Sequence, residues 1–191
     1  MNTLYPIFIK PENIRILIVG GGNVALEKLS FIYKSSPQAI VTLVSPMIRP
    51  ETLDFIEDKE VTIINEKYKP VFLKGHQLVI ATTDDKEVNK QVSAEARKEG
   101  ILVNIADTPD LCDFYLGGIV TKGHLKIAIS TQGKSPTFAK RMREWLEAII
   151  PAEIDESIQN LYAVRNKLRG DFSAKLKQMD EITASFIPEK N

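Results

Sequence analysis

The chain has little of the chemistry that marks metal sites, disulfide-rich folds or membrane proteins. It contains one cysteine, Cys112, and two histidines, His76 and His124, among 191 residues. One cysteine cannot form an internal disulfide, and neither histidine is spaced with Cys112 as metal ligands are. The longest apolar runs have strand length, far below the ~20 residues of a membrane helix. We therefore expect a cytoplasmic protein without a permanent metal, an export signal or a membrane segment.

An excess of charge of either sign is also missing. Lys plus Arg and Asp plus Glu each number 25, so the formal net charge is zero. Proteins that bind nucleic acid or anionic membranes through bulk charge are usually basic, and we expect neither partner here. The apolar share of 43% and the charged share of 26% are those of an ordinary folded chain.

Short apolar runs dominate the first 110 residues, and helical patterns separate them. The runs cover residues 14–19, 40–44, 61–64, 78–81 and 101–105. A helical pattern over 23–34 and another that begins at Asp84, the expected N-cap, and ends near Lys98 are the clearest helices. Apolar strands that alternate with helices indicate a parallel sheet covered on both faces. We predict an α/β, Rossmann-like domain over residues 1–111.

The pattern changes after residue 111. Two strand patterns, 114–120 and 125–130, flank a hairpin signal, so we expect the sheet to become antiparallel there. Ser135 as N-cap and Pro136 as first helical residue then open a helix that ends near Ile150.

Two further helical patterns, 152–169 and 172–185, hold too few residues for a core of their own. We predict a small α+β region over 112–150 and a helical C-terminal region over 151–191.

The sharpest motif directly follows the first apolar run. Gly20-Gly21-Gly22-Asn23-Val24-Ala25 reads G-x-G-x-x-A between a strand and a helix, as in dinucleotide-binding proteins. Gly20 permits a tight turn, Gly22 lets the backbone approach a pyrophosphate, and Ala25 permits close helix–strand packing. The helix N-terminus then favours the anion. An ordinary strand-to-helix turn is the alternative, and the context favours the dinucleotide.

The acidic ribose ligand expected ~20 residues after the glycines is missing. Ser45-Pro46-Met47 ends the second strand instead, and Ser45 would bond a ribose hydroxyl less strongly. Arg49 would favour a 2′-phosphate. The residues alone therefore leave the choice between NAD and NADP open.

A second candidate site follows the fifth apolar run, in residues 104–109. Asp107 lies where open α/β sheets bind ligands, and its carboxylate is placed to accept a proton beside a hydride acceptor. An Asp before Thr-Pro is also a common turn former, so both interpretations stay open.

A third candidate site is the loop of residues 130–136. Ser130, Thr131 and Ser135 supply hydroxyls and Lys134 a positive charge before a helix N-terminus, and Arg141 and Arg143 follow. Such a loop suits an anionic ligand. A capped helix with a solvated basic face is the alternative.

These motifs together resemble the precorrin-2 dehydrogenase family, which includes the N-terminal part of sirohaem synthase. Their order and spacing fit along nearly the whole chain, and the resemblance weakens after about Pro151. The matching stretches are Tyr5-Pro6-Ile7-Phe8, Leu17 to Ala25, Ala81-Thr82-Thr83-Asp84-Asp85, Val88-Asn89, Val103 to Asp107 and Gly133-Lys134-Ser135-Pro136.

The resemblance implies NAD-dependent oxidation of precorrin-2 to sirohydrochlorin by a cytoplasmic homodimer that dimerises through 112–150. Some members also insert Fe²⁺ to make sirohaem, and the family lacks the acidic ribose ligand. It places the catalytic carboxylate on Asp107 and a serine that is phosphorylated in some relatives on Ser135. It implies cofactor contacts at Gly20, Gly21, Gly22, Asn23, Val24, Ala25, Ser45, Pro46, Thr82, Thr83 and Asp84, and substrate contacts at Asn104, Ser130, Thr131, Lys134, Ser135 and Arg141. A non-catalytic NAD-sensing module is the competing class, because the fold alone does not give the function.

Overall fold

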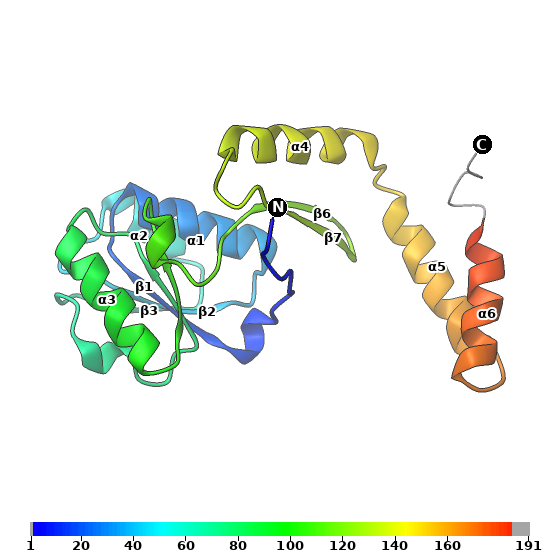
Figure 1. The fold of residues 1–191 in the computed structure, drawn as a ribbon, viewed down its shortest axis with the longest axis horizontal. Coiled ribbons are helices and arrows are strands. Elements are labelled where there is room, and N and C mark those ends of the chain that lie inside the picture. Colours follow the sequence, from blue (N-terminus) through cyan, green and yellow to red (C-terminus); the bar gives the residue numbers. More distant parts are fainter. Residues whose placement is uncertain (1, 185–191) are drawn as a thin grey trace. The chain divides into compact units, whose positions relative to one another are not determined.

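A five-stranded parallel sheet forms the centre of the N-terminal part (Figure 1). The computed structural model describes residues 2–184. The strands are β1 (Arg15–Val19), β2 (Ile40–Val44), β3 (Val61–Ile64), β4 (Leu78–Ala81) and β5 (Leu102–Ile105), in the order β3-β2-β1-β4-β5. Every neighbouring pair is parallel. The predicted Rossmann-like fold is confirmed, and β2, β3 and β4 coincide with the apolar runs.

Helices cover both faces of this sheet because successive strand residues point to opposite sides. On one face, Ile16 and Ile18 of β1 pack with residues of α1 (Asn23–Ser35) and α2 (Pro50–Ile56). On the other face, Leu17 and Val19 pack with α3 (Lys86–Lys98). The sheet is therefore the middle of three layers, with the central strands β1 and β4 buried on both faces and the outer strand β3 partly exposed.

Two details of this domain differ from the sequence-based expectations. The helix α2 was not predicted, and it buries only Thr52 and Ile56. The N-cap of α3 is Asp85 rather than Asp84, because the Asp85 carboxylate accepts bonds from the backbone N–H groups of Glu87 and Val88. Short 3₁₀ turns at Pro11–Asn13, Pro70–Leu73 and Pro109–Leu111 complete the domain.

The predicted hairpin is present but does not extend the parallel sheet. Strands β6 (Gly118–Lys122) and β7 (Leu125–Ile129) pair only with each other, as a separate antiparallel sheet. The expectation that the main sheet becomes antiparallel is therefore wrong. The following helices are α4 (Pro136–Ile149), α5 (Ile154–Lys167) and α6 (Phe172–Thr183). Residue 185, the expected end of the last helix, lies outside the described residues.

The chain divides into two compact units. The first runs to Gly117 and also includes Ser130–Ala139, and the second comprises Gly118–Ile129 and the chain from Lys140 onward.

One carboxylate joins the hairpin to α5 within the second unit. Asp155 Oδ1 accepts bonds from the backbone N–H of His124 (2.6 Å) and lies 2.7 Å from His124 Nδ1, while Gln159 donates to Oδ2 (2.8 Å). These bonds to His124 hold the pKa of Asp155 below its ordinary value.

Within residues 2–184, no helix combines the length and the apolar character needed to cross a membrane. The same residues contain no cluster of three or more His, Cys, Asp or Glu side chains arranged to hold a metal ion.

Candidate functional site

The residues that follow β1, β2, β4 and β5 lie side by side at one edge of the sheet. Their backbone N–H groups extend the sheet ladder by one further bond each. These bonds run from Gly20 to Val44 (2.8 Å), from Ser45 to Ile64 (3.1 Å), from Thr82 to Val19 (2.8 Å) and from Ala106 to Ala81 (2.9 Å). The parallel pairing thus brings four candidate segments, far apart in sequence, to one edge.

This edge contains the point where the strand order reverses. The chain builds outward from β1 through β2 to β3 and then returns to β4 on the other side of β1. Open α/β sheets bind their ligands at such a point, beyond the carboxyl ends of the strands. The region beyond the carboxyl ends of β1 and β4 is therefore the expected cofactor site.

Gly20 makes the tight turn that the motif predicts. Its φ is +116°, a conformation that side chains disfavour. A Cβ atom there would lie 2.6 Å from Thr82 Oγ1, and that hydroxyl donates to the Val19 carbonyl (3.0 Å). The absence of a side chain lets β1 and β4 end in direct contact.

Gly21 has a role that the motif does not predict, since its position is the variable one. A Cβ atom there would lie 2.6 Å from the Met47 carbonyl. The Gly21 carbonyl accepts bonds from the Arg49 N–H (3.0 Å) and the Thr52 hydroxyl (3.4 Å). Gly21 therefore anchors the loop that follows β2.

Gly22 and Ala25 provide the geometry that a dinucleotide pyrophosphate needs. A Cβ atom at Gly22 would have no other atom within 4 Å, so the space above this backbone is open. Gly22 is the N-cap of α1 and forms no side-chain cap bond, which leaves the first turn to an anion. Ala25 is fully buried, as close helix–strand packing requires. Asn23 and Val24 lie in the same first turn. These residues fit the cofactor.

Ser45 is buried, and its hydroxyl donates to the Met47 carbonyl (2.7 Å). It therefore shapes the loop after β2, while Pro46 is exposed beside it. Arg49 is paired with Glu51 through two 3.1 Å hydrogen bonds, which raise the pKa of Arg49 and lower that of Glu51.

The turn after β4 is held by side chains. The Thr83 hydroxyl lies 2.8 Å from Asn89 Oδ1, and Asn89 Nδ2 donates to the Thr83 carbonyl (2.9 Å). Asp84 is exposed between Thr83 and the cap Asp85. The turn therefore has a fixed course beside the glycine loop, because Thr82 contacts Gly20.

Asp107 lies just beyond β5 in a strained conformation. Its φ is +57°, and only one other non-glycine residue in 2–184, Gln132, has a positive φ. Asp tolerates this region better than most residues, and backbone strain is concentrated at functional sites. The Asp107 side chain is exposed, and its neighbour Ala106 bonds to the end of β4. Asp107 thus lies at the edge that carries the glycine loop.

The loop around Asp107 is fixed by residues whose role was not predicted. The Cys112 thiol donates to the Ile105 carbonyl (3.2 Å) and accepts from the Ile105 N–H (3.2 Å). Asp113 accepts bonds from the Val103 N–H (3.1 Å) and from Arg97 (3.0 Å). Burial raises the pKa of the Cys112 thiol. The only sequence signal was that Cys112 and Asp113 closely follow Asp107.

Asn104 is buried in the same region. Its amide NH₂ group donates to the Phe114 carbonyl (2.8 Å). This bond uses one end of the side chain to hold the segment that follows β5, so only the amide oxygen is left to meet a ligand.

The loop of residues 130–136 has the conformation of a capped helix start. The Ser135 hydroxyl accepts the Phe138 N–H (3.3 Å), which confirms Ser135 as N-cap. Thr131 Oγ1 accepts the Ser135 N–H (3.1 Å), and Ser130 Oγ accepts the Gln132 N–H (3.2 Å). Each oxygen acts as an acceptor, so each hydroxyl hydrogen is the part able to donate to an anion.

Lys134 is exposed on this loop. The loop belongs to the first unit, and it is bonded to the N-terminal segment, because Asn2 donates to the Ser130 carbonyl and Gln132 donates to the Thr3 hydroxyl. Arg141, the remaining predicted substrate residue, belongs to the second unit. The structure therefore brings the glycine loop, Ser45, Thr82 and Asp107 to one edge, while Ser130–Ser135 has its own attachment.

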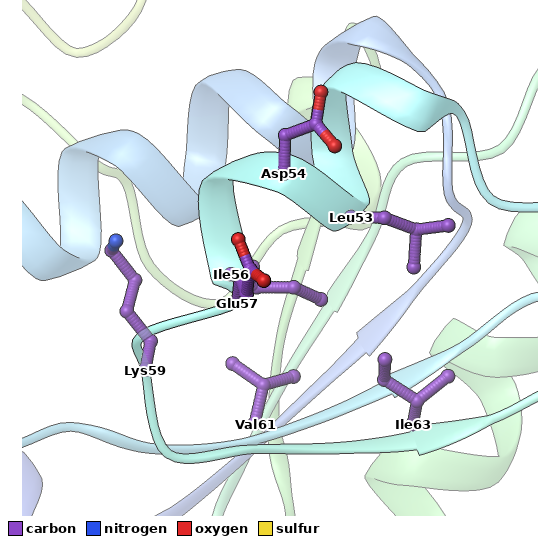
Figure 2. A pocket seen from close by; sticks show the side chains of 7 residues that line it. All are labelled: Leu53, Asp54, Ile56, Glu57, Lys59, Val61 and Ile63. Atoms are coloured by element: carbon purple, nitrogen blue, oxygen red, sulfur yellow. The ribbon is translucent and has the colours of Figure 1, made fainter.

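A shallow cavity of about 400 Å³ lies elsewhere, between α2 and the outer strand β3 (Figure 2). Figure 2 shows Glu57 above the apolar side chain of Val61, while Asp54 points away from the strand and Lys59 lines the other side. Carboxylates at its wall would repel a pyrophosphate. This cavity is not at the strand ends and does not fit the cofactor.

Two families match this chain in succession. Residues 7–118 match a family described as putative NAD(P)-binding, and residues 122–149 match one described as sirohaem biosynthesis protein central. The first match covers the whole parallel sheet and extends beyond Asp107. It confirms a nicotinamide dinucleotide as the cofactor.

Known proteins resemble the chain over most of its length. The sirohaem synthase of Psychrobacter cryohalolentis is 36% identical over 176 residues, which are 92% of this chain and 32% of that protein. The enzyme of Methylobacillus flagellatus is 40% identical over 152 residues, 80% of this chain and 32% of that protein. The chain thus spans about a third of the length of these relatives.

A solved structure extends the likeness to the fold. The precorrin-2 dehydrogenase SirC matches with a TM-score of 0.74 and 25% identity, over 94% of this chain and 89% of that one. This protein therefore combines the parallel sheet, the separate hairpin and the glycine loop with the family motifs in their expected order. The chain belongs to the NAD(P)-binding family that includes precorrin-2 dehydrogenase and the N-terminal part of sirohaem synthase.

Proposed function

We propose that this protein oxidises precorrin-2 to sirohydrochlorin with NAD⁺ in sirohaem biosynthesis. The observation that carries the proposal is the shared sheet edge, where an open glycine loop lies two strands away from a strained, exposed Asp107. A dehydrogenase needs such an arrangement of a dinucleotide site and a proton acceptor. The likeness to SirC, a precorrin-2 dehydrogenase, supports the choice of substrate.

The reaction removes two electrons and two hydrogens from the macrocycle. Bound NAD⁺ supplies the hydride acceptor and leaves as NADH. A C–H bond of precorrin-2 breaks as the hydride departs, and a proton is lost to extend the conjugation. Asp107 accepts that proton, because its carboxylate is exposed at the edge where the substrate must lie. Cys112 and Asp113 hold the backbone on which this base sits.

NAD⁺ is preferred to NADP⁺ because the one nearby guanidinium is already paired. Arg49 would have to leave the Glu51 carboxylate to bind a 2′-phosphate, and Glu51 would then repel that phosphate. We therefore assign NAD⁺, with Gly20–Ala25 at the pyrophosphate and the turns at Ser45–Pro46 and Thr82–Asp84 beside it.

The carboxylates at the rim of precorrin-2 are assigned to the loop of residues 130–136. Lys134 is exposed there, and the hydroxyls of Ser130, Thr131 and Ser135 precede the N-terminus of α4. Cations and helix N-termini both stabilise carboxylates. We also assign Asn104 and Arg141 as substrate contacts; Arg141 would exchange the Glu144 carboxylate, to which it donates over 3.1 Å, for a substrate carboxylate.

The assembly is assigned as a homodimer through residues 112–150. The hairpin β6–β7 has only two strands, and such a sheet has exposed edges that need cover. On α4, Met142, Trp145 and Ile149 recur at helical spacing, and Trp145 and Ile149 are more than half exposed. An apolar stripe of this kind is typical of a helix that packs against another.

A visible-absorption assay tests the function. The full chain is mixed with precorrin-2 and NAD⁺, and the appearance of sirohydrochlorin and NADH is followed, with and without Fe²⁺. Sirohydrochlorin without added metal supports the dehydrogenase, and further conversion to sirohaem on addition of Fe²⁺ supports an additional chelatase activity. NAD⁺ binding with no turnover would instead favour a sensing module.

A further inference from the structure

The N-terminal segment 3–10 has no regular secondary structure, and its large apolar side chains are exposed. Tyr5 is 87% exposed, Phe8 68% and Ile7 58%. The segment forms no helix or strand before the short turn that begins at Pro11. Large apolar side chains gathered in one short exposed segment mark a binding surface.

This segment begins at the loop assigned to the substrate carboxylates. Asn2 Nδ2 donates to the Ser130 carbonyl, and Gln132 Nε2 donates to Thr3 Oγ1; both distances are 3.4 Å. Both partners belong to the first unit. The exposed side chains of Tyr5, Ile7 and Phe8 therefore follow within a few residues of the loop.

The backbone of Gln132 is a second, independent indication that the fold defines the contact between the N-terminal segment and this loop. Its φ is +55°, and Asp107 is the only other non-glycine residue in 2–184 with a positive φ. Strain of this kind persists where surrounding contacts hold it. Here the strained residue is the one whose side chain reaches the N-terminal segment.

We propose that Tyr5, Ile7 and Phe8 form an apolar platform for the flat face of the tetrapyrrole, while the loop of residues 130–136 holds its carboxylate rim. The proposal rests on the function proposed above and names the residues that select a planar substrate. A tetrapyrrole has two conjugated apolar faces and an anionic rim, so it needs both kinds of surface.

Aromatic side chains suit this task because they stack on planar rings and lose little conformational freedom. Lys10 follows the platform and adds a positive charge at its far end. The dinucleotide needs none of these residues, because its contacts are at the glycine loop. The platform should therefore affect tetrapyrrole affinity and leave NAD⁺ affinity alone.

Titration of the full chain with sirohydrochlorin, followed by absorbance, tests the platform. Tyr5→Ala and Phe8→Ala should each weaken sirohydrochlorin binding about tenfold, as loss of a stacked ring does. Tyr5→Phe keeps the ring and should bind as the wild type. Tyr162→Ala removes another exposed tyrosine, 64% exposed and on α5, and serves as the matched control. NAD⁺ affinity, measured by calorimetry, reports whether the dinucleotide domain is intact in every variant.

Three results would overturn the platform, and they are distinguishable. Wild-type sirohydrochlorin affinity in both alanine variants would show that the segment does not contact the substrate. A lower molecular mass by light scattering, in step with the loss of binding, would show that a second copy covers the segment. A wild-type protein that binds NAD⁺ but no sirohydrochlorin would remove the proposed function together with the platform.

Discussion

The parallel sheet and the two C-terminal helices differ in how much of their apolar surface they bury. Leu17, Ile18 and Leu43 of the sheet are fully buried. Helices α5 and α6 contain no buried residue, and Phe172 and Leu176 of α6 are 72% and 52% exposed. The first region therefore carries its own core, whereas the second exposes apolar side chains that are free to contact other surfaces. The candidate site lies on the self-contained region, where a rigid frame can hold it.

The largest effect is expected from substitution of Asp107. This test shows whether the sheet edge takes part in the chemical step or only binds ligands. Removal of a positioned base typically lowers the rate ~10²–10⁴-fold, so Asp107→Ala should lower dehydrogenase turnover by about that factor with NAD⁺ affinity nearly intact. Asp107→Asn keeps the shape and should be almost as slow. Near-wild-type turnover in the alanine variant would make Asp107 a turn residue, and rescue by Asn would make it an orienting one.

The glycine loop tests the cofactor side of the same edge. Gly22→Asp places a carboxylate where the pyrophosphate should lie, and like charges ~4 Å apart cost about 4 kcal/mol near a protein surface. NAD⁺ affinity should fall roughly a thousandfold. The fold should survive because a Cβ atom at Gly22 meets nothing. Gly22→Ala adds the Cβ without the charge and should bind NAD⁺ far better than Gly22→Asp does. Equal NAD⁺ affinities of the two variants in a calorimetric titration would reject the placement of the pyrophosphate at Gly22.

One leucine in each region tests the contrast in burial directly. Leu43→Ala empties a fully buried site and should lower the free energy of unfolding of the dinucleotide domain by about 2–5 kcal/mol. Leu176→Ala removes the same atoms from an exposed site and should change the free energy of unfolding of the protein by less than about 0.5 kcal/mol. Urea unfolding of both variants measures the difference. A comparable loss at Leu176 would mean that α6 is covered in the assembled protein.

A pair of glycines tests how the hairpin is joined to α5. Gly123 has φ +56°, and a Cβ atom there would lie 2.0 Å from Asp155 Cγ. Gly100 has φ +68° with nothing within 4 Å. Alanine at either site costs about 1–2 kcal/mol of backbone strain, but only Gly123→Ala also displaces Asp155. Hydrogen exchange in α5 should therefore accelerate in Gly123→Ala alone. Unchanged exchange there would show that the joint tolerates a side chain.

Much of the first region follows from local sequence patterns. Strands β2 and β4 coincide with apolar runs because a strand that helices cover on both faces must be largely apolar. The outer strand β3 also coincides with an apolar run, although Thr62 and Ile63 are exposed. The helix α2 was missed because it is short and buries only two residues. The N-cap was placed one residue early because Asp84 and Asp85 are equivalent as sequence and only the backbone course separates them.

The residues of the glycine motif could be predicted from the sequence, but the long-range contacts that hold the candidate site in place could not. The glycine motif gave the positions of Gly20, Gly22 and Ala25, because each obeys a local steric rule. The contact of Gly21 with the Met47 loop depends on a segment about 25 residues away. The thiol bonds of Cys112 depend in the same way on the course of the chain after β5. Such long-range contacts leave no periodic signal in a single sequence.

The smallest effect is expected from acid, and it separates the two regions by pH. The bonds to His124 hold the pKa of Asp155 below its ordinary value, so the folded second unit takes up this proton at a lower pH than the unfolded chain does. The stabilisation is therefore fully present above the unfolded pKa of about 3.9 and is lost as pH falls through the lower folded value. Protection from hydrogen exchange in β6–β7 and α5, taken relative to the intrinsic exchange rate at each pH, should be high at neutral pH and fall below about pH 4. Asp155→Asn should remove that fall and show the lower protection already at neutral pH. Asp171→Asn, at the N-cap of α6, keeps an equivalent cap and should leave the response of the hairpin unchanged. An acid response that persists in Asp155→Asn would assign it to another carboxylate.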